Sequence, residues 1–276
     1  MTDHIDGAAL LDEVDAFHRR FTIFPTNAAY VAVALWAAHT HLLDGFTSTP
    51  RLALLSDEPS SGKSRALQIT ATLVPRPTAA VNPTPKALVR AVSARDGHPT
   101  ILLDEADTVF SSRTKGSEEL RGLLTAGHRR SSTMLRCAGE APSTRRVRKF
   151  SPYCAVALAG LGSLPETILA RSVAIRMRRR ATNERVEPYR RRIHEAEGHA
   201  LRDRLAVWAD QVGNQVTDAS PELPDSIFGR PADVWEPLLA VAEAAGGTWP
   251  QRARAACAEL AAVAMQDDAN ETRKNA

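Results

Sequence analysis

The spacing of hydrophobic residues changes repeatedly along the chain, which predicts strands alternating with helices. Nearly continuous apolar runs at 51–55, 100–103 and 153–158 are typical of strands buried on both faces, and 79–81 and 173–177 are weaker strand candidates. Apolar residues recur three or four positions apart at 63–73, 85–92, 118–126 and 165–171, which indicates helices. This order predicts an α/β fold with a parallel sheet flanked by helices.

Helical patterns also flank this region on both sides. Residues 8–20 and 27–43 predict two helices before the first strand, and residues 187–212, 232–245 and 249–264 predict a helical region after the last one. Residues 266–276 are polar, and we expect them to be frayed. The pattern therefore divides the chain into an amino-terminal helical cap (1–50), an α/β core (51–180) and a helical lid (181–276).

Composition narrows the class of protein. The chain has 276 residues and is 43% hydrophobic, which is enough to form a core. Its longest apolar stretch, 28–43, contains His39 and His41 and is too short to span a bilayer, and the first residues do not resemble a secretory signal. The three cysteines, at 137, 154 and 257, lack metal-ligand spacing. We expect a globular cytoplasmic protein with no membrane contact.

Residues 57–64, Asp-Glu-Pro-Ser-Ser-Gly-Lys-Ser, lie between a predicted strand and a predicted helix and resemble a phosphate-binding loop. In such a loop Gly62 lets backbone N–H groups close around phosphate oxygens, Lys63 reaches the terminal phosphates and the Ser64 hydroxyl binds Mg²⁺. The motif usually begins with another glycine, and Asp57 occupies that position here. The residues expected to contact a nucleotide are Pro59, Ser60, Ser61, Gly62, Lys63, Ser64 and Arg65.

A second motif supports the first. The apolar run at 100–103 ends in Asp104 and Glu105, two adjacent carboxylates at the tip of a predicted strand. In a nucleoside triphosphatase of this kind, Asp104 would hold the magnesium shell and Glu105 would polarise the attacking water. Either motif alone is common, but their order and flanking elements together favour a nucleotide site.

Positive charge is concentrated in two segments, although the formal net charge of the chain is only +3. Residues 128–150 contain seven basic residues against one acidic residue, and residues 171–192 contain nine arginines against two glutamates. The first segment includes a predicted hairpin, 131–137 with 146–150, that would project from the core. Its candidate nucleic-acid contacts are Arg136, Arg145, Arg146, Arg148 and Lys149. Solvated faces or contacts within the fold would explain such runs equally well.

Several segments together resemble a domain family of unknown function found in actinobacterial phage, prophage and plasmid proteins. They are the two nucleotide motifs and the segments LDEAD (103–107), ALAGLG (157–162), LP (164–165), ARS (170–172), ADVWEPLL (232–239) and AGGTWP (245–250). Larger members of that family look like primase-helicase proteins, and their core is similar to that of AAA+ ATPases. The resemblance covers roughly residues 20–260 and implies a P-loop NTPase core of the AAA+ type with a carboxy-terminal helical lid.

The resemblance also implies roles for two arginines. Arg171 would be a finger that reaches the γ-phosphate held by a neighbouring subunit, and Arg230 would be a lid arginine that contacts the bound nucleotide. AAA+ proteins carry a polar residue at the tip of the strand after the Asp-Glu motif, whereas this chain has Ala159 and Gly160 there, with Ser163 the nearest hydroxyl. An ordinary surface ion pair remains an alternative for each arginine.

The main functional hypothesis is an ATPase that uses ATP and Mg²⁺, with DNA as a candidate activator, and that remodels nucleic acid or a replication complex of a mobile element. It would form a homo-oligomer with nucleotide at subunit interfaces, and its partners would include DNA and replication proteins. A hypothesis from a different functional class is a switch or adaptor that binds ATP but hydrolyses it weakly, because Asp57 and the absent polar sensor weaken ATP hydrolysis. A third hypothesis is a mobile-element regulator or defence component that uses the ATPase core as a scaffold.

Overall fold

The computed structural model describes residues 4–81, 83–93, 97–111, 115–138 and 146–275. Its centre is a five-stranded parallel sheet with the strand order β2-β3-β6-β1-β7. The strands are β1 (Arg51–Ser56), β2 (Pro77–Val81), β3 (Thr100–Asp104), β6 (Ala155–Leu161) and β7 (Ser172–Arg176). The predicted α/β class with a parallel sheet is confirmed.

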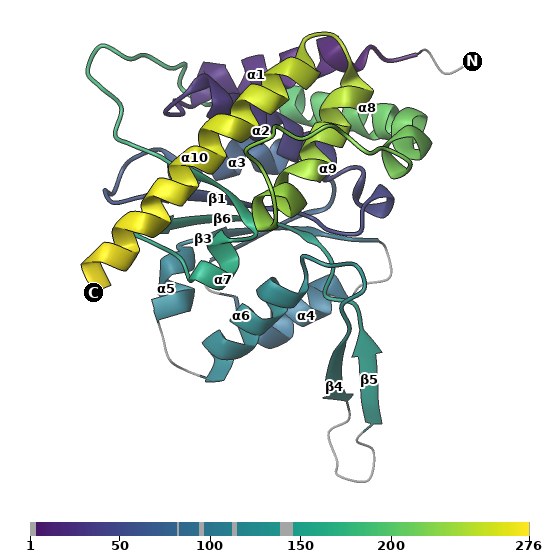
Figure 1. Ribbon diagram of the computed structural model, residues 1–276, viewed down its shortest axis with the longest axis vertical. Helices are drawn as coiled ribbons and strands as arrows, with labels where there is room; N and C mark the ends of the chain where they lie inside the picture. Colours follow the sequence, from purple (N-terminus) through teal and green to yellow (C-terminus); the bar gives the residue numbers. More distant parts are fainter. Residues whose placement is uncertain (1–3, 82, 94–96, 112–114, 139–145, 276) are drawn as a thin grey trace.

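Helices cover both faces of the sheet, as Figure 1 shows. On one face lie α1 (Gly7–Phe21), α2 (Asn27–His39), α3 (Lys63–Leu73), α8 (Arg191–Thr217), α9 (Arg230–Ala245) and α10 (Trp249–Asn275). On the other face lie α4 (Pro85–Val92), α5 (Ala106–Ser111), α6 (Lys115–Ala126) and α7 (Glu166–Leu169). A short 3₁₀ helix spans Leu43–Gly45.

The apolar runs of the strands follow from this two-sided cover. In β1, Leu52 and Leu54 belong to the hydrophobic cluster on the first face, and Ala53 and Leu55 belong to the cluster on the second. Successive side chains of a strand point to opposite faces, so a strand covered on both sides must be apolar at every position. All six residues of β1 are buried, including Arg51.

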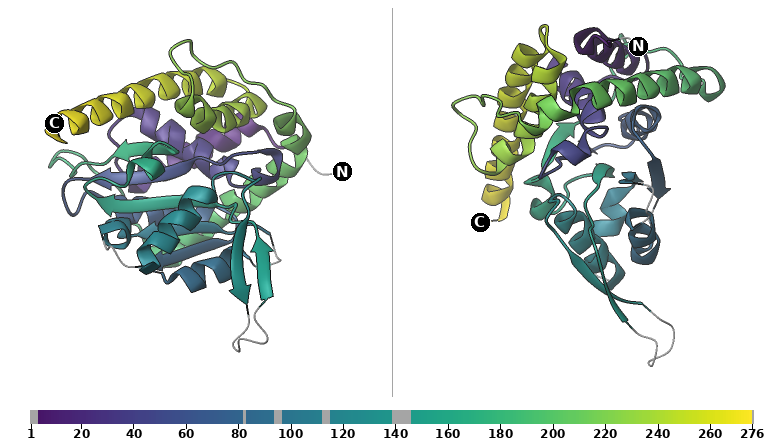
Figure 2. Two further views of the ribbon diagram at one scale, coloured as in Figure 1. Left: turned by 60° about the horizontal axis from the view of Figure 1, so that its bottom comes forward. Right: turned by 90° about the vertical axis from the view of Figure 1, so that its right-hand side faces the viewer.

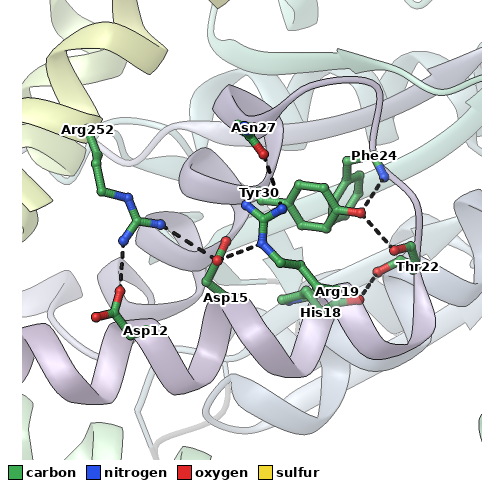
Figure 3. Close-up of polar contacts among 9 residues, drawn as sticks. All are labelled: Asp12, Asp15, His18, Arg19, Thr22, Phe24, Asn27, Tyr30 and Arg252. Atoms are coloured by element: carbon green, nitrogen blue, oxygen red, sulfur yellow. Dashed lines mark hydrogen bonds and ion pairs between the residues drawn. The ribbon is translucent and has the colours of Figure 1, made fainter. Parts of the chain in front are cut away.

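The helices from the two ends of the chain pack into one layer. Buried residues of α1, α2, α8, α9 and α10 form a single hydrophobic cluster, which includes all four tryptophans of the chain. Polar contacts also join α1 to α10, because Arg252 lies 2.7 Å from Asp12 and 3.6 Å from Asp15 (Figure 3). The predicted cap and lid therefore share a core, and the division of the chain into three domains stays a prediction.

Figure 3 also shows how the turn between α1 and α2 is fixed. The Tyr30 hydroxyl donates to Thr22 O at 2.9 Å and accepts from Phe24 N at 3.1 Å. Arg19 donates to Asp15 of its own helix at 2.8 Å and to Asn27 at the start of α2 at 3.1 Å. These bonds hold the two helices together at the point where the chain turns.

A two-stranded hairpin, β4 (Met134–Ala138) and β5 (Arg146–Phe150), projects from the α4–α6 side of the molecule (Figures 1 and 2). Met134 and Phe150 at its base pack on the second hydrophobic cluster. Leu135 and Val147 are 62% and 64% exposed further along the strands. A hairpin was predicted here, although its first strand begins at Met134 rather than at residue 131.

Other boundaries also differ from the prediction. Helix α5 was not predicted, β6 continues to Leu161 rather than ending at 158, and α2 ends at His39 rather than at residue 43. Helix α10 continues to Asn275, whereas fraying was expected from residue 266. No glycine or proline follows Pro250, and Asp267 pairs with Arg176 of β7 at 2.9 Å, so the helix has no signal to stop there. Among the described residues, no helix combines the length and the apolar character needed to cross a membrane.

Candidate functional site

The loop after β1 connects a buried strand directly to the amino terminus of a helix, at the positions expected from the sequence. Strand β1 ends at Ser56 and α3 begins at Lys63. Gly62 caps the helix with φ 87°, and Ser60 also has a positive φ of 62°. Gly62 offers no side chain to the first N–H groups of α3, so these donors remain without a side-chain cap. This arrangement suits an anion at the helix terminus.

Lys63 is held over this loop. Its side chain is buried, and its Nζ donates to Ser61 Oγ at 2.9 Å and to Glu58 O at 3.3 Å. Burial lowers the pKa of Lys63, and the carboxylates of Asp107, Asp104 and Asp57 oppose that shift, in decreasing order. The loop thus holds one ammonium group with three carboxylates near it.

The structure brings Ser64 and Asp104 together. Strand β6 lies between β1 and β3, and because all three strands are parallel their carboxyl ends meet at one edge of the sheet. Ser64, just after the loop, and Asp104, at the end of β3, line the same cavity of about 440 Å³. A hydroxyl and a carboxylate are the hard oxygen ligands that Mg²⁺ prefers, so these two residues fit a magnesium site completed by phosphate and water oxygens.

Glu105 has an unusual backbone conformation. It is exposed, its φ is 54°, and its N–H donates to Asp104 Oδ1 at 3.0 Å. A side-chain-bearing residue in the left-handed region costs about 1 kcal/mol or more and is most often found where function requires it. The conformation turns the chain sharply from β3 into α5.

Asp107 is a residue of this region that the sequence interpretation did not select. Its Oδ1 accepts from Leu161 N at 2.9 Å, and a Cβ at Gly160 would lie 3.1 Å from the same oxygen. A carboxylate from α5 therefore occupies the tip of β6, where the chain itself has Ala159 and Gly160. Ser163, in contrast, donates to Leu164 O. The sequence signal was the third acidic residue in LDEAD, together with a glycine at 160.

A second cavity, of about 320 Å³, adjoins the loop on another side. Its lining comes from three parts of the chain: Phe21, Thr22, Ile23, Ser60, Ser61, Gly62, Arg65, Arg178, Arg180, Val186, Glu187, Pro188 and Tyr189. Arg179 lies beside it, with its Nε 3.2 Å from Glu58 Oε2 and 3.0 Å from Pro59 O. Arg179 was seen in the sequence only as part of a basic run, because its partners lie about 120 residues earlier in the chain.

Arg171 and Arg230 lie together, but at the opposite edge of the sheet. Arg171 directly precedes β7, and its carbonyl accepts from the N–H of Arg51, the first residue of β1. Both arginines line a cavity of about 290 Å³ with His128 and Arg129. Arg230 lines this cavity and neither of the two cavities at the phosphate loop, and its predicted contact with a bound nucleotide stays a prediction. Helix α9, which Arg230 begins, packs on α2 and α10 instead.

The candidate nucleic-acid residues lie on the hairpin. The register pairs Arg136 with Arg148, and Lys149, which is exposed, with Leu135. Arg146 begins β5, and Arg145 falls outside the described residues. The predicted basic residues thus share one projecting element.

Comparison with known proteins gives two matches, each of which covers about a third of the chain. Over 97 residues the chain is 44% identical to a protein of Saccharopolyspora erythraea described as an uncharacterized 28.9 kDa protein in a xis 5′ region, which is 35% of this chain and 36% of that relative. The chain thus spans about a third of the length of the curated relative it matches. Residues 176–275 match the model of a family described as a protein of unknown function, DUF3631. The segment from the end of β7 through α10 is therefore similar to the DUF3631 family.

Proposed function

We propose that the chain is a magnesium-dependent ATPase with a P-loop core of the AAA+ type. The observation that carries this proposal is the convergence of Lys63, Ser64 and Asp104 at the carboxyl edge of the sheet, with Ser64 and Asp104 lining one cavity. Ligands of open α/β sheets bind outside the carboxyl ends of the strands, where a strand order reverses. In this sheet β2, β3 and β6 lie on one side of β1 and the last strand, β7, lies on the other side. The strand order therefore reverses at β1.

The residues take distinct roles in this proposal. The N–H groups at Gly62 and the start of α3 bind phosphate oxygens, and Lys63 leaves Ser61 Oγ to neutralise the terminal phosphates. Mg²⁺ held by Ser64 and Asp104 would neutralise charge that develops on the phosphate oxygens. Glu105, exposed beside Asp104, orients and polarises the attacking water. Asp107, fixed by Leu161 N, supplies the polar group at the tip of β6.

In this proposal the basic hairpin is the element through which the ATPase contacts its partner. It projects from the body of the molecule and carries Arg136, Arg146, Arg148 and Lys149, as a lever on nucleic acid or on a replication complex would. The relative's description as a protein in a xis 5′ region agrees with a mobile-element setting. Arg171, at the sheet edge opposite the loop, would contact the nucleotide of a neighbouring copy rather than its own in this proposal.

A nucleotide-binding switch that hydrolyses ATP weakly is the second candidate function. Two observations favour it. Asp57 adds a carboxylate near Lys63, which opposes the binding of phosphate. Arg179 also ties Glu58 and Pro59 of the loop to the segment after β7, so that nucleotide binding would be sensed by the DUF3631 region.

The test is ATP hydrolysis by purified protein with Mg²⁺, measured together with nucleotide binding. Lys63→Ala should lose nucleotide binding, because the buried ammonium that meets the phosphates is gone. Glu105→Gln should bind nucleotide with unchanged affinity and lose at least 100-fold in turnover, since general-base catalysis contributes about 10²–10⁴-fold. Glu118→Gln, an exposed glutamate on α6, is the matched control and should leave turnover unchanged.

The outcomes separate the two functions. Turnover that is lost in Glu105→Gln but kept in Glu118→Gln supports the ATPase. Nucleotide binding that depends on Lys63, with negligible turnover in the unmodified chain, supports the switch. Nucleotide binding that survives Lys63→Ala would remove the loop from both proposals.

A further inference from the structure

We propose that the cavity lined by Arg129, Arg171 and Arg230 is a second phosphate-binding site, at the edge of the sheet opposite the phosphate loop. The cavity has a volume of about 290 Å³, and segments 47–50, 128–131, 170–171 and 230–236 form its walls. Nothing in the strand or loop pattern predicts it, because its three arginines come from segments more than 40 residues apart.

Arg171 is held in place before any ligand arrives. Its Nε donates to His128 Nε2 at 3.2 Å, and its Nη1 donates to Thr167 O at 2.6 Å. His128 Nδ1 lies 2.6 Å from Thr125 O and must donate to that carbonyl, which leaves Nε2 free to accept. Burial lowers the pKa of His128 to about 4, so the ring is neutral at pH 7 and serves as an acceptor. A guanidinium fixed at two nitrogens loses little entropy when it binds an anion.

The positive charges in this cavity are poorly compensated. Among the described residues, neither Arg171 nor Arg230 forms an ion pair with a carboxylate, and the contact between Arg129 and Asp233 is long, at 3.9 Å. Burial lowers the pKa of Arg171, and the charges of Arg230 and Arg129 lower it further. Two carboxylates, Asp233 and Glu236, also line the cavity. An anion with two or three acceptor oxygens would relieve the repulsion among the three guanidinium groups.

A buried hydroxyl supplies an independent sign of a missing ligand. Thr49 lines the cavity, is only 1% exposed, and its Oγ1 has no hydrogen-bond partner among the described residues. Native structures usually satisfy buried polar atoms. Because this oxygen has almost no accessible surface, a phosphate or a water that it orders would satisfy it only after the Thr49 side chain turns toward the cavity. The chemistry of the ligand is thus a phosphoryl group, which can belong to free phosphate or to a nucleotide held by a second copy of the chain.

The first experiment titrates inorganic phosphate into the full chain carrying Lys63→Ala, which disables the loop as a competing site. We expect saturable binding by calorimetry or by ³¹P NMR. Adding Arg230→Ala or Arg129→Ala should weaken it at least tenfold, and Arg171→Lys, which loses the forked geometry, should weaken it as well. Arg185→Ala removes an exposed arginine outside the cavity and should bind phosphate like the parent. Absence of saturable binding, or equal affinity in the Arg230→Ala and Arg185→Ala proteins of matching thermal stability, overturns the proposal.

The second experiment identifies the source of the phosphate and rests on the proposed ATPase. A Lys63→Ala copy keeps the cavity and loses the loop, whereas an Arg230→Ala copy keeps the loop and loses the cavity. If the phosphate belongs to a neighbour's nucleotide, each protein alone is slow and mixing the two restores ATP hydrolysis. If it is free phosphate, the Arg230→Ala protein alone hydrolyses ATP at the rate of the unmodified chain and mixing adds nothing. The phosphate titration does not involve hydrolysis, so failure of the cavity and failure of the ATPase give different results.

Discussion

At the residue scale, His18 and His39 are buried without partners. Both are fully inaccessible, and among the described residues no hydrogen bond reaches either ring. His39 packs against Phe46 with ring centroids 4.8 Å apart, and His18 lies 5.9 Å from the Phe24 ring. The two rings fill space as neutral aromatic groups.

These histidines should make the protein sensitive to mild acid. Burial lowers the pKa of each to about 3, whereas the unfolded chain titrates near 6.5, so below pH 6.5 the unfolded state binds more protons than the folded state. Stability is therefore complete above pH 6.5 and falls as the pH drops, by about 2 kcal/mol per histidine between pH 7 and pH 5.

Urea unfolding at pH 7 and pH 5 checks this prediction. The double variant His18→Leu, His39→Leu should lose less stability between the two pH values than the unmodified protein does. His4→Gln, at an exposed position, should behave like the unmodified protein. An unchanged pH dependence in the double variant would contradict the assignment.

The sequence predicted those site residues that lie beside a strand or helix boundary. Asp104 follows an apolar run, and Lys63 and Ser64 begin a helical pattern, so the strand and helix pattern already locates them at element ends. Asp107 and Arg179 could not be selected in this way. The contact of Asp107 with Leu161 depends on the order of the strands in the sheet, and the contact of Arg179 with Glu58 depends on how the segment after β7 packs against the loop after β1. Local spacing carries no information about which distant segments meet.

At the element scale, α8 contains two glycines in different surroundings. A Cβ at Gly198 would lie 2.1 Å from Thr72 Oγ1 and 2.6 Å from Thr72 Cβ on α3, whereas a Cβ at Gly213 would meet nothing within 4 Å. Gly198 therefore allows α8 to approach the helix that follows the phosphate loop, and Gly213 has no such role.

Alanine at the two positions should act in opposite directions. Gly198→Ala should destabilise the protein by about 1–3 kcal/mol, because α8 and α3 must move apart. Gly213→Ala should stabilise it by up to about 1 kcal/mol, because alanine favours helix more than glycine does. Denaturant midpoints of both variants, measured in parallel, test the helix contact; two stabilised variants would show that α8 does not pack this closely.

The hairpin allows a prediction about nucleic acid. Reversing two charges with Arg146→Glu and Arg148→Glu should weaken DNA binding and lower the slope of log K against log salt by up to about 2, because each phosphate contact contributes about 0.9. Lys86→Glu with Arg90→Glu on α4 changes the net charge equally at exposed positions elsewhere and is the control. DNA binding by both variants, measured over a range of salt concentrations, tests this prediction. Equal effects of the two pairs would show attraction by net charge rather than by the hairpin.

At the scale of the whole molecule, the shared core of the terminal helices predicts cooperative unfolding. All four tryptophans lie in the cluster on one face of the sheet, and the cluster on the other face has none. Since both clusters include residues of β1 and β6, tryptophan fluorescence and far-ultraviolet circular dichroism should give the same urea midpoint. A fluorescence midpoint at lower urea would show that the helical layer unfolds separately as a lid.

Strand β1 joins the two candidate phosphate sites. The loop follows its last residue, and the backbone of its first residue bonds to Arg171, so the sites lie at opposite ends of a strand about 20 Å long. A nucleotide that touches both sites must therefore lie between the phosphate loop, at the carboxyl edge of one copy's sheet, and the arginine cavity, at the opposite edge of the next copy's sheet. Such a contact pairs two different sites. Two antiparallel copies that exchange it reciprocally form a twofold dimer, whereas copies that point the same way repeat it until it closes as a ring or continues as a filament. Should the neighbour supply the phosphate, the direction of one buried strand would set the polarity of such a ring or filament.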